Sequence, residues 1–418
     1  MLLTRTALAT AAIAAAVAGI AGNAAAQSGQ PIKIGFSISE TGGLAPNGKP
    51  ALLAHKIWEE DVNAKGGILG RPVKLVYYDD QSNPSTVPGI YTKLLDVDKV
   101  DLVVGAYATQ MVAPAMPVVM QKNKTFISLL ALAVNTEFKY PNYFAMIPSG
   151  PDTKASFTEG FFQTAMAQDP KPTTVALVAA DQEFSRNACD GARENAARAK
   201  LKVTYDNTYP PSTTDYAPIV RAIAATKPDI VVVCSYPPDS VGIVKAVNEI
   251  GFKPKQLGGA MVGLQATPLK AQLGPMLNGI VNFDMWLPVP KLQFDGVNDL
   301  IAKYQARAKA EGVDPLGYYM APCSYAQLQV LQQAIEGTKS LDDKKLSAYL
   351  HANTFHTVWG DIKFNKDGEW VQPRMLQVQF HDVKGNDIEQ FRTMGTQTVL
   401  TPAEYKSGDV IYPYEKAK

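Results

Sequence analysis

The most informative stretches of the chain are Asp101-Leu-Val-Val-Gly-Ala-Tyr-Ala-Thr-Gln110 and Thr125-Phe-Ile-Ser-Leu-Leu-Ala-Leu-Ala133. Each contains a short apolar run, Leu102–Val104 or Phe126–Leu130, that passes into a loop of small and hydroxyl residues, with an apolar, helix-like segment between the two. This pattern is typical of parallel strands, and ligands of open α/β sheets bind beyond the carboxyl ends of such strands. The helix that follows each strand offers unpaired N–H groups there, so the two loops are predicted to hold an anion together.

The alternation of strands and helices continues on both sides of these stretches. Before them we expect strands at Pro31–Ile38 and Val73–Tyr78, an amphipathic helix between these strands, and a helix around Ile90–Val97. After Pro148 a second series begins, in which helices are expected at Thr153–Ala167, Arg186–Ala199, Tyr216–Ala225 and Val241–Ile250, and strands at Thr174–Ala179, Lys202–Tyr205, Ile230–Cys234 and near Leu257. Because parallel strands need crossover connections, the pattern predicts two doubly wound, Rossmann-like α/β units in tandem.

The last third of the chain is less regular. A strand is expected at Ile280–Met285, followed by helices at Val297–Ala310, Tyr325–Glu336 and Lys344–His351. The segments Asp361–Phe364 and Met375–His381 then read as short strands, and the Lys-Asp-Gly tripeptide between them is a hairpin signal.

Length and charge narrow the range of functions. A chain of 418 residues is too long for one ordinary core and favours two lobes. With 46% hydrophobic and 19% charged residues the chain is globular, and a formal net charge of +1 argues against a nucleic-acid partner. The partner is therefore expected to be a small molecule bound in a pocket.

The first 26 residues have the features of a secretory signal peptide. Arg5 precedes an Ala-rich apolar run without any acid, and Ala24-Ala-Ala26 offers a small-residue cleavage site. The alternative, a membrane anchor, is disfavoured because the apolar core is short. No later stretch is long and apolar enough to span a bilayer, so we expect an exported, periplasmic protein.

Catalytic, metal-binding and disulfide signatures are missing from the sequence. Gly66-Gly-Ile-Leu-Gly70 follows a helix and precedes a strand, which is the wrong context for dinucleotide binding, and there is neither a Gly-x-Ser-x-Gly elbow nor a phosphate loop. The four histidines show no metal-ligand spacing. The three cysteines are far apart, and Cys234 ends an apolar run, as a buried small hydrophobe does. We therefore expect no enzyme activity, no cofactor and no metal.

Several motifs resemble the type I periplasmic solute-binding proteins of the leucine/isoleucine/valine-binding class. The motifs, in chain order, are Ile32-Lys-Ile-Gly with Thr41-Gly-Gly, Asp61-Val-Asn-Ala-Lys-Gly-Gly-Ile-Leu-Gly-Arg71, Val76-Tyr-Tyr-Asp-Asp-Gln-Ser-Asn-Pro84, Val103-Val-Gly-Ala, Asp215-Tyr-Ala-Pro-Ile-Val, Pro228-Asp-Ile-Val-Val-Val and Gly360 to Gly368. The resemblance covers nearly all of the chain after the signal peptide. The run that ends Asn-Ala-Lys-Gly-Gly-Ile-Leu-Gly-Arg is specific, whereas a Gly pair alone would be weak.

The resemblance implies two α/β lobes joined by three crossings, in the Venus-flytrap arrangement, with a ligand cleft between the lobes. The crossings are expected near Pro148, near Asn282–Pro288 and near Thr357–Gly360. Lobe one would hold residues 30–148 and 286–357, and lobe two residues 149–285 and 358–418. Hinge closure around the ligand is implied, as are partners in the membrane, namely the permease and ATPase subunits of an ABC importer. We expect a monomer.

In this family two loops of lobe one hold the ligand carboxylate, and they match Tyr107, Ala108, Thr109 and Gln110 and, in the second loop, Leu130, Ala131 and Leu132. Thr109 and Gln110 can donate side-chain hydrogen bonds, and the backbone N–H groups of the second loop are expected to face the anion. Thr109 alternatively serves as a helix N-cap. Where family members carry a hydroxyl, this chain has Leu132, so one donor is lost and the wall becomes more apolar.

Lobe two departs from the family at the position of the acid that pairs with a ligand ammonium, which aligns with Ala260. A buried ammonium without a partner costs several kcal/mol, so α-amino acids are disfavoured. Asp181, Glu183 or Asp239 remain alternative partners for such a group. Phe184 and Tyr236 match pocket aromatics, whereas Trp286, Tyr318 and Tyr319 serve equally well in a core or hinge.

The sequence thus predicts the binding component of a branched-chain amino-acid-type importer whose ligand is a small carboxylate. The body of the ligand would be aromatic or branched and apolar, without an α-amino group. Two alternatives stay open: an α-amino-acid-binding protein for leucine, isoleucine, valine or an aromatic residue, and a ligand sensor of the amide- or urea-receptor type.

Overall fold

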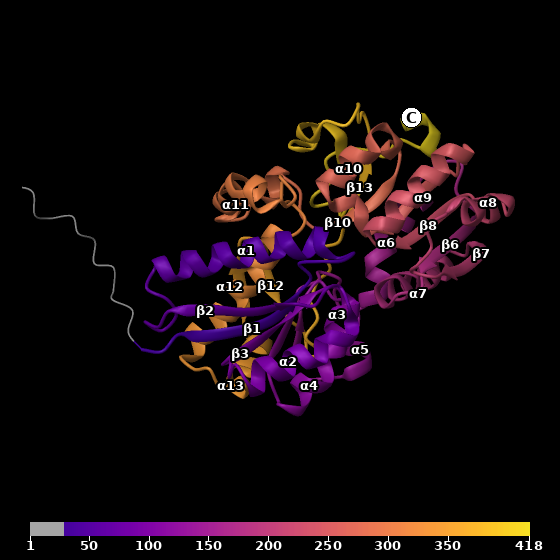
Figure 1. Cartoon of the computed structure of the whole chain (residues 1–418). Helices are drawn as coiled ribbons and strands as arrows, with labels where there is room; N and C mark the ends of the chain where they lie inside the picture. The colour runs from indigo at the N-terminus through magenta and orange to yellow at the C-terminus, as the bar shows by residue number, and fades with distance from the viewer. Residues whose placement is uncertain (1–28) are drawn as a thin grey trace, which may run out of the picture.

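The computed structural model describes residues 29–418, and the expected signal peptide at residues 1–26 lies outside them. Two α/β lobes, each built around its own sheet, lie side by side (Figure 1). The predicted fold class, two doubly wound lobes, is confirmed. Across the described residues, no helix has the length and apolar character needed to cross a membrane.

The sheet of the first lobe contains five parallel strands in the order β2-β1-β3-β4-β5. Their bounds are β1 Ile32–Ile38, β2 Val73–Asp79, β3 Leu102–Tyr107, β4 Phe126–Leu129 and β5 Tyr143–Ala145. Every residue of β3 and β4 is buried. This explains their continuous apolar character, because helices cover both faces of a parallel sheet.

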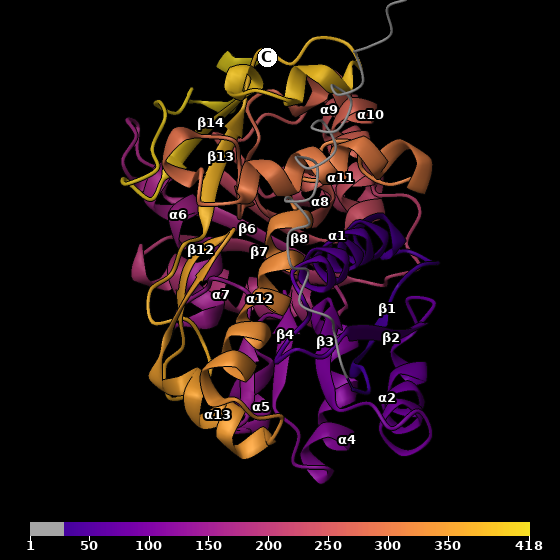
Figure 2. The ribbon, with the colours of Figure 1, turned by 90° about the vertical axis from the view of Figure 1, so that its left-hand side faces the viewer.

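Helices from distant parts of the chain cover this sheet. They are α1 (Ala45–Ala64), α2 (Val87–Asp96), α3 (Thr109–Val112), α4 (Met116–Gln121), α5 (Val134–Phe138), α12 (Ala321–Thr338) and α13 (Asp343–Ala352), and α11 (Val297–Glu311) packs on α1 and α12. Figure 2 shows α12 beside β3 and β4. The buried Gln327 side chain of α12 donates hydrogen bonds of 3.0 Å to the carbonyl oxygen of Gly105 and 2.8 Å to that of Ile127. The C-terminal helices thus complete the first lobe.

The sheet of the second lobe contains seven strands in the order β14-β13-β10-β9-β8-β6-β7. The strands β6 (Thr174–Ala180), β7 (Lys202–Tyr209), β8 (Ile230–Ser235), β9 (Gln256–Met261) and β10 (Val281–Asp284) are parallel, whereas β13 (Leu376–Phe380) and β14 (Gln397–Thr401) add in antiparallel orientation. Its helices are α6 (Thr153–Met166), α7 (Glu183–Arg198), α8 (Ala217–Ala225), α9 (Pro237–Ile250) and α10 (Thr267–Leu273).

The chain passes between the sheets after β5, after β10 and before β13. In the third passage β11 (Thr354–Thr357) pairs with β12 (Gly360–Lys363), and the Trp370 indole N–H donates to the carbonyl oxygen of Ala145, at 3.1 Å, in the first lobe. We therefore propose that the third crossing follows Trp370 instead of falling at Thr357–Gly360. The rest of the expected lobe boundaries stays a prediction.

The predicted pairing around the Lys-Asp-Gly turn is wrong. The turn itself forms, because Phe364 and Trp370 make an antiparallel bridge across it. However, β12 pairs with β11, while β13 pairs with β10 and β14 of the other sheet. A local turn signal identifies the bend but not the long-range partners of the strands beside it.

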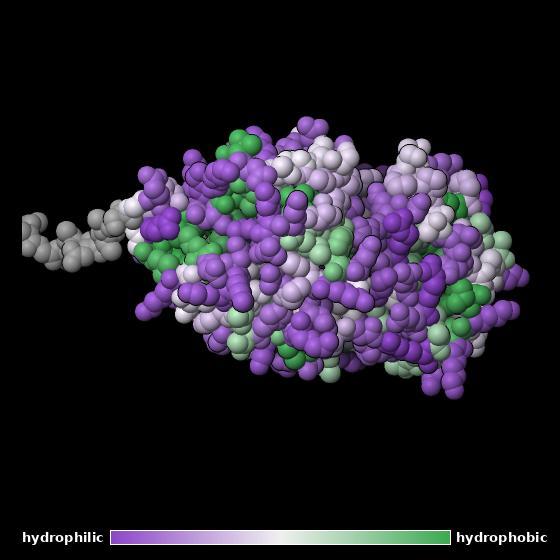
Figure 3. All heavy atoms as spheres, turned by 90° about the horizontal axis from the view of Figure 1, so that it is seen from below, coloured by the Kyte–Doolittle hydropathy of each residue, from purple (hydrophilic) through white to green (hydrophobic). Residues whose placement is uncertain are grey.

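The face of the molecule in Figure 3 is mainly hydrophilic, with small separate hydrophobic patches. Most large apolar side chains lie in the interior, and Trp58, Trp286 and Trp359 are among the largest fully buried ones. Residues that bind small molecules are therefore best sought between the lobes.

Candidate site between the lobes

An apolar cavity lies where strand ends of the two sheets face each other. Seven of its ten lining residues lie at or just after the carboxyl end of a strand, as expected for α/β sheets, and the lining comprises Tyr107, Ala108, Leu130, Ile147, Phe157, Phe184, Tyr236, Val262, Met285 and Tyr319. The side chains leave only about 10 Å³ of free volume between them, roughly the space of one water molecule. The conformation is thus a tightly closed one.

The first predicted loop, Tyr107 to Gln110, continues β3 into α3. Ala108 has φ 81° and ψ 144°, a backbone conformation that L-residues rarely adopt and that costs roughly 1–3 kcal/mol. The Tyr107 hydroxyl accepts a 2.8 Å hydrogen bond from the Asn47 amide. The Thr109 hydroxyl, fully buried, accepts a 3.0 Å hydrogen bond from the Leu132 N–H and thereby ties the first loop to the second.

The second predicted loop follows β4, and only Leu130 of its three candidate residues lines the cavity. Ala131 and Leu132 are fully buried behind it. Among the backbone N–H groups of this loop, which were expected to face an anion, that of Leu132 is bonded to the Thr109 hydroxyl in this conformation. The role of the loop in anion binding stays a prediction. Leu130 (φ 46°) and Ala133 (φ 60°) both adopt left-handed backbone conformations. Such strain gathers at ligand-binding loops because the surrounding structure must hold it.

From the second lobe, Phe184 and Tyr236 line the cavity with ring centroids 5.4 Å apart. The Tyr236 hydroxyl donates a hydrogen bond to Oε1 of Gln110, so these two predicted site residues join the lobes directly. A second bond across the gap runs from the Asn187 amide to the carbonyl oxygen of Leu132, at 3.1 Å.

The segment expected to lack the acid of the family lies at the end of β9. Ala260 lies inside β9, paired with Cys234 and fully buried, and it does not line the cavity. The residue of this segment that does so is Val262, just after the strand ends. Both residues are apolar, so the segment supplies no carboxylate to the cavity.

The polar groups of the cavity are neutral. In the described part of the chain, no Asp, Glu, Lys or Arg lines the cavity. Burial raises the pKa of the Tyr107, Tyr236 and Tyr319 hydroxyls above the usual value. These phenols therefore stay protonated at neutral pH and can donate hydrogen bonds to an acceptor on a ligand.

Sequence reasoning missed Ile147, Val262 and Met285 and left Tyr319 undecided. Val262 and Met285 lie just after or at the end of expected strands, so the rule of strand ends would have found them. Ile147 follows β5, which was not expected. Phe157 lies on α6, and its ring contacts Phe184 edge to face and Phe283 in a tilted arrangement. No local sequence signal points to it.

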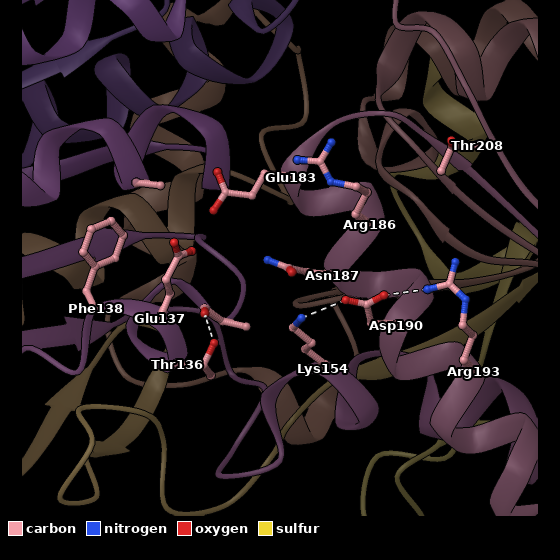
Figure 4. A pocket seen from close by; sticks show the side chains of 12 residues that line it. Thr136, Glu137, Phe138, Lys154, Glu183, Arg186, Asn187, Asp190, Arg193 and Thr208 are labelled. Atoms are coloured by element: carbon pink, nitrogen blue, oxygen red, sulfur yellow. Dashed lines mark hydrogen bonds and ion pairs between the residues drawn. The ribbon is translucent and has the colours of Figure 1, made fainter.

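A separate polar cleft of about 590 Å³ opens beside the cavity, between α5 of the first lobe and α7 of the second (Figure 4). Its cations are paired with acids: Lys154 with Asp190 at 2.8 Å and Arg193 with Asp190 at 2.5 Å, while Arg186 pairs with Asp181 at 2.6 Å. Burial, followed by the nearby charge of Glu137, raises the pKa of Glu183 to about 7. Of the three alternative ammonium partners, only Glu183 lines this cleft.

The other two alternative ammonium partners, Asp181 and Asp239, do not line the cleft, and each is engaged by another side chain. Asp239 is buried and accepts a 2.5 Å hydrogen bond from the Tyr209 hydroxyl, and burial raises its pKa to about 6.

Among residues 29–418, no group of three His, Cys, Asp or Glu side chains is arranged to hold a metal ion. Cys189, Cys234 and Cys323 are free and buried.

Known proteins share this architecture. The model of the periplasmic binding protein family matches residues 31–384. A curated relative, Leu/Ile/Val-binding protein homolog 7 of Brucella abortus (strain 2308), is 24% identical over 382 residues, which cover 89% of this chain and 94% of the relative.

Solved structures of other proteins share the fold of this chain over most of its length. The branched-chain amino acid transporter substrate binding protein LivJ of Streptococcus pneumoniae, in complex with isoleucine, has a TM-score of 0.72 and 19% identity, covering 89% of this chain and 100% of its own. A solute binding protein of an ABC transporter of R. palustris, in complex with benzoate, also has a TM-score of 0.72 and 19% identity, covering 91% and 98%. The family model covers most of the chain, and the chain accordingly belongs to the periplasmic binding protein family.

Proposed function

We propose that this protein is the periplasmic, monomeric ligand-binding component of an ABC importer of the branched-chain amino-acid type. It binds a small carboxylate with an aromatic or branched apolar body and no α-amino group, and it delivers this ligand to a membrane permease driven by an ATPase. It catalyses no reaction. The observation that carries the proposal is the interlobe cavity, which aromatic and aliphatic side chains line without any charged group.

The chemistry of the lining favours an acceptor over a cation. A carboxylate accepts hydrogen bonds from phenol hydroxyls, and such charge-assisted bonds are stronger than neutral ones. An ammonium needs a carboxylate or several acceptors when it is buried, and leaving it unpaired costs several kcal/mol. The phenol hydroxyls of Tyr107, Tyr236 and Tyr319 can donate to a carboxylate, whereas the apolar Val262 offers no acceptor to an ammonium.

The body of the ligand would lie against Phe157, Phe184 and Leu130. Since the closed cavity has about 10 Å³ of free volume, entry of the ligand requires the lobes to move apart. The bond between Tyr236 and Gln110 would then exchange its partner for the ligand. The benzoate complex of a structural neighbour supports this ligand class, whereas the isoleucine complex of another supports the alternative.

The test is calorimetric titration with a matched pair of ligands, 3-phenylpropanoate and phenylalanine, which differ only in the amino group. We expect 3-phenylpropanoate to bind at least about 100-fold more tightly, since an unpaired buried ammonium costs several kcal/mol. Benzoate and leucine extend the comparison to a smaller ring and a branched body. Tighter binding of leucine or phenylalanine than of the acids without an amino group would overturn the proposed ligand class.

A further inference from the structure

Two glutamates from different lobes face each other across the polar cleft. Glu137 belongs to α5 of the first lobe and Glu183 is the first residue of α7 in the second, and both carboxylates point into the cleft (Figure 4). In the described part of the chain, no hydrogen bond or ion pair engages either carboxylate. The cations of the cleft are held by other acids, Asp181 and Asp190.

The charged and titratable groups around Glu183 leave its negative charge poorly balanced. Glu137 faces it from α5, Lys154 from α6, Arg186 from its own helix, and the phenols of Tyr143 and Tyr236 lie within electrostatic range. Lys154 and Arg186 already share their charge with partners. Two carboxylates that approach in a partly buried cleft repel each other, and one of them retains a proton more readily.

We propose that Glu137 and Glu183 make ligand capture acid-favoured, because closure of the lobes brings the two carboxylates together and takes up a proton. The proposal rests on the proposed ligand-driven closure. In the closed form burial, followed by the charge of Glu137, raises the pKa of Glu183 to about 7, and we expect opening of the lobes to return it toward the ordinary value of 4.5 as water reaches the carboxylate. Closure is therefore least costly below about pH 4.5, becomes more costly as pH rises between these values, and is most costly above about pH 7.

The first test is the dissociation constant for 3-phenylpropanoate between pH 8 and pH 5.5. The cleft is open to solvent, which screens the repulsion, so we expect binding about tenfold tighter at pH 5.5 rather than the full effect of the shift. Titration in buffers of different ionisation enthalpy should also show uptake of about half a proton on binding near pH 6.5. A constant affinity and no proton uptake would overturn the proposal.

Variants identify the groups responsible. Glu183→Gln should bind at pH 8 about as tightly as the unchanged protein binds at pH 5.5, with no remaining pH dependence, and Glu137→Gln should remove part of the dependence. The matched control is Glu194→Gln on α7, since Glu194 pairs with Arg198 away from the cleft. If Glu183→Gln keeps the full pH dependence, then other buried carboxyls, such as Asp239 and Asp284 with pKa values of about 6, are responsible and the proposal is wrong.

A second test needs no ligand. The three native cysteines are buried, so spin labels can be directed to Glu336→Cys on α12 and Arg221→Cys on α8, two exposed positions on different lobes. The distance between the labels should shorten as pH falls from 8 to 5.5, and the additional Glu183→Gln change should give the short distance at both values. Shortening without binding of any tested acid would contradict the proposed function alone, whereas binding without any response to pH would contradict this inference alone.

Discussion

The cavity and the polar cleft lie between the same two lobes but differ in the charge of their linings and in their free volume. The cavity is lined by neutral aromatic and aliphatic side chains and has almost no free volume, whereas the cleft holds ion pairs and two unpaired carboxylates. The Leu130–Ala133 loop and its bond to Asn187 lie between the two spaces. We interpret the cavity as the place where ligands are selected and the cleft as the place where the cost of closure is set.

The largest effect on ligand binding is expected from a charge placed in the cavity. Leu130→Asp should weaken binding of 3-phenylpropanoate by at least about 100-fold, because a carboxylate without a cation would be buried against the apolar body of the ligand. Calorimetry at pH 8 measures the loss. Leu130 has φ 46°, a conformation that Asp and Asn tolerate better than Leu, so the fold should be retained.

Leu130→Asn is the control for that variant, since it has the same shape without the charge. We expect it to bind far more tightly than Leu130→Asp. Equal losses in the two variants would show that shape, and not charge, governs the cavity.

The next largest effect concerns the bond that holds the two loops of the cavity together. Thr109→Val removes the acceptor of the buried Leu132 N–H, which should lower the free energy of unfolding by about 1–3 kcal/mol. Urea denaturation measures this change. Thr109→Ser retains the hydroxyl and should restore most of the loss, and a Val variant as stable as the unchanged protein would contradict the role given to Thr109.

A smaller effect is expected from a phenol that both lobes share. Tyr236→Phe keeps the ring but loses the hydroxyl that bonds Gln110, and it should weaken ligand binding about five- to tenfold, as expected for one hydrogen bond. Tyr236→Leu should lose more, because the ring is lost as well. If Tyr236→Phe binds the ligand as the unchanged protein does, the hydroxyl is not a ligand donor.

The smallest expected effect tests the strain in the first loop. Ala108→Gly relieves an unfavourable backbone conformation and should raise the free energy of unfolding by about 0.5–1 kcal/mol, after the greater chain entropy of Gly is subtracted. Ligand affinity should fall two- to threefold, by roughly 0.5 kcal/mol, because the loop is less preorganised.

Ala106→Gly, inside β3, is the matched control for this variant and should destabilise the protein, since no strain is relieved there. If both Gly variants lower stability equally, the conformation of Ala108 stores no strain.

The sequence predicted the helices and strands better than it predicted which residues contact each other across the fold. The strands β3 and β4 were predictable because fully buried parallel strands are continuously apolar, while β5, only Tyr143–Ala145, is too short to leave a pattern. Tyr107, Leu130, Phe184 and Tyr236, named from the sequence as ligand-binding residues, line the cavity, and their contact with a ligand stays a prediction.

The roles of Thr109 and Gln110 were not predictable in the same way. Both were expected to donate to a ligand, yet in this conformation one holds the neighbouring loop and the other holds the opposite lobe. Such contacts join residues that are up to 126 positions apart, and a single sequence carries no signal for them. The shift from Ala260 to Val262 has a similar origin, because the end of β9 is set by its pairing with β8.

The enclosure of the cavity has a kinetic consequence. Since Tyr236 and Phe184 line one side and the loops after β3 and β4 line the other, we expect a bound molecule to leave only when the hinge opens. The rate of opening then sets an upper limit on dissociation that all ligands share. Weak and strong ligands would differ in how often they are recaptured before escape, and a membrane partner that opens the hinge would speed the release of both.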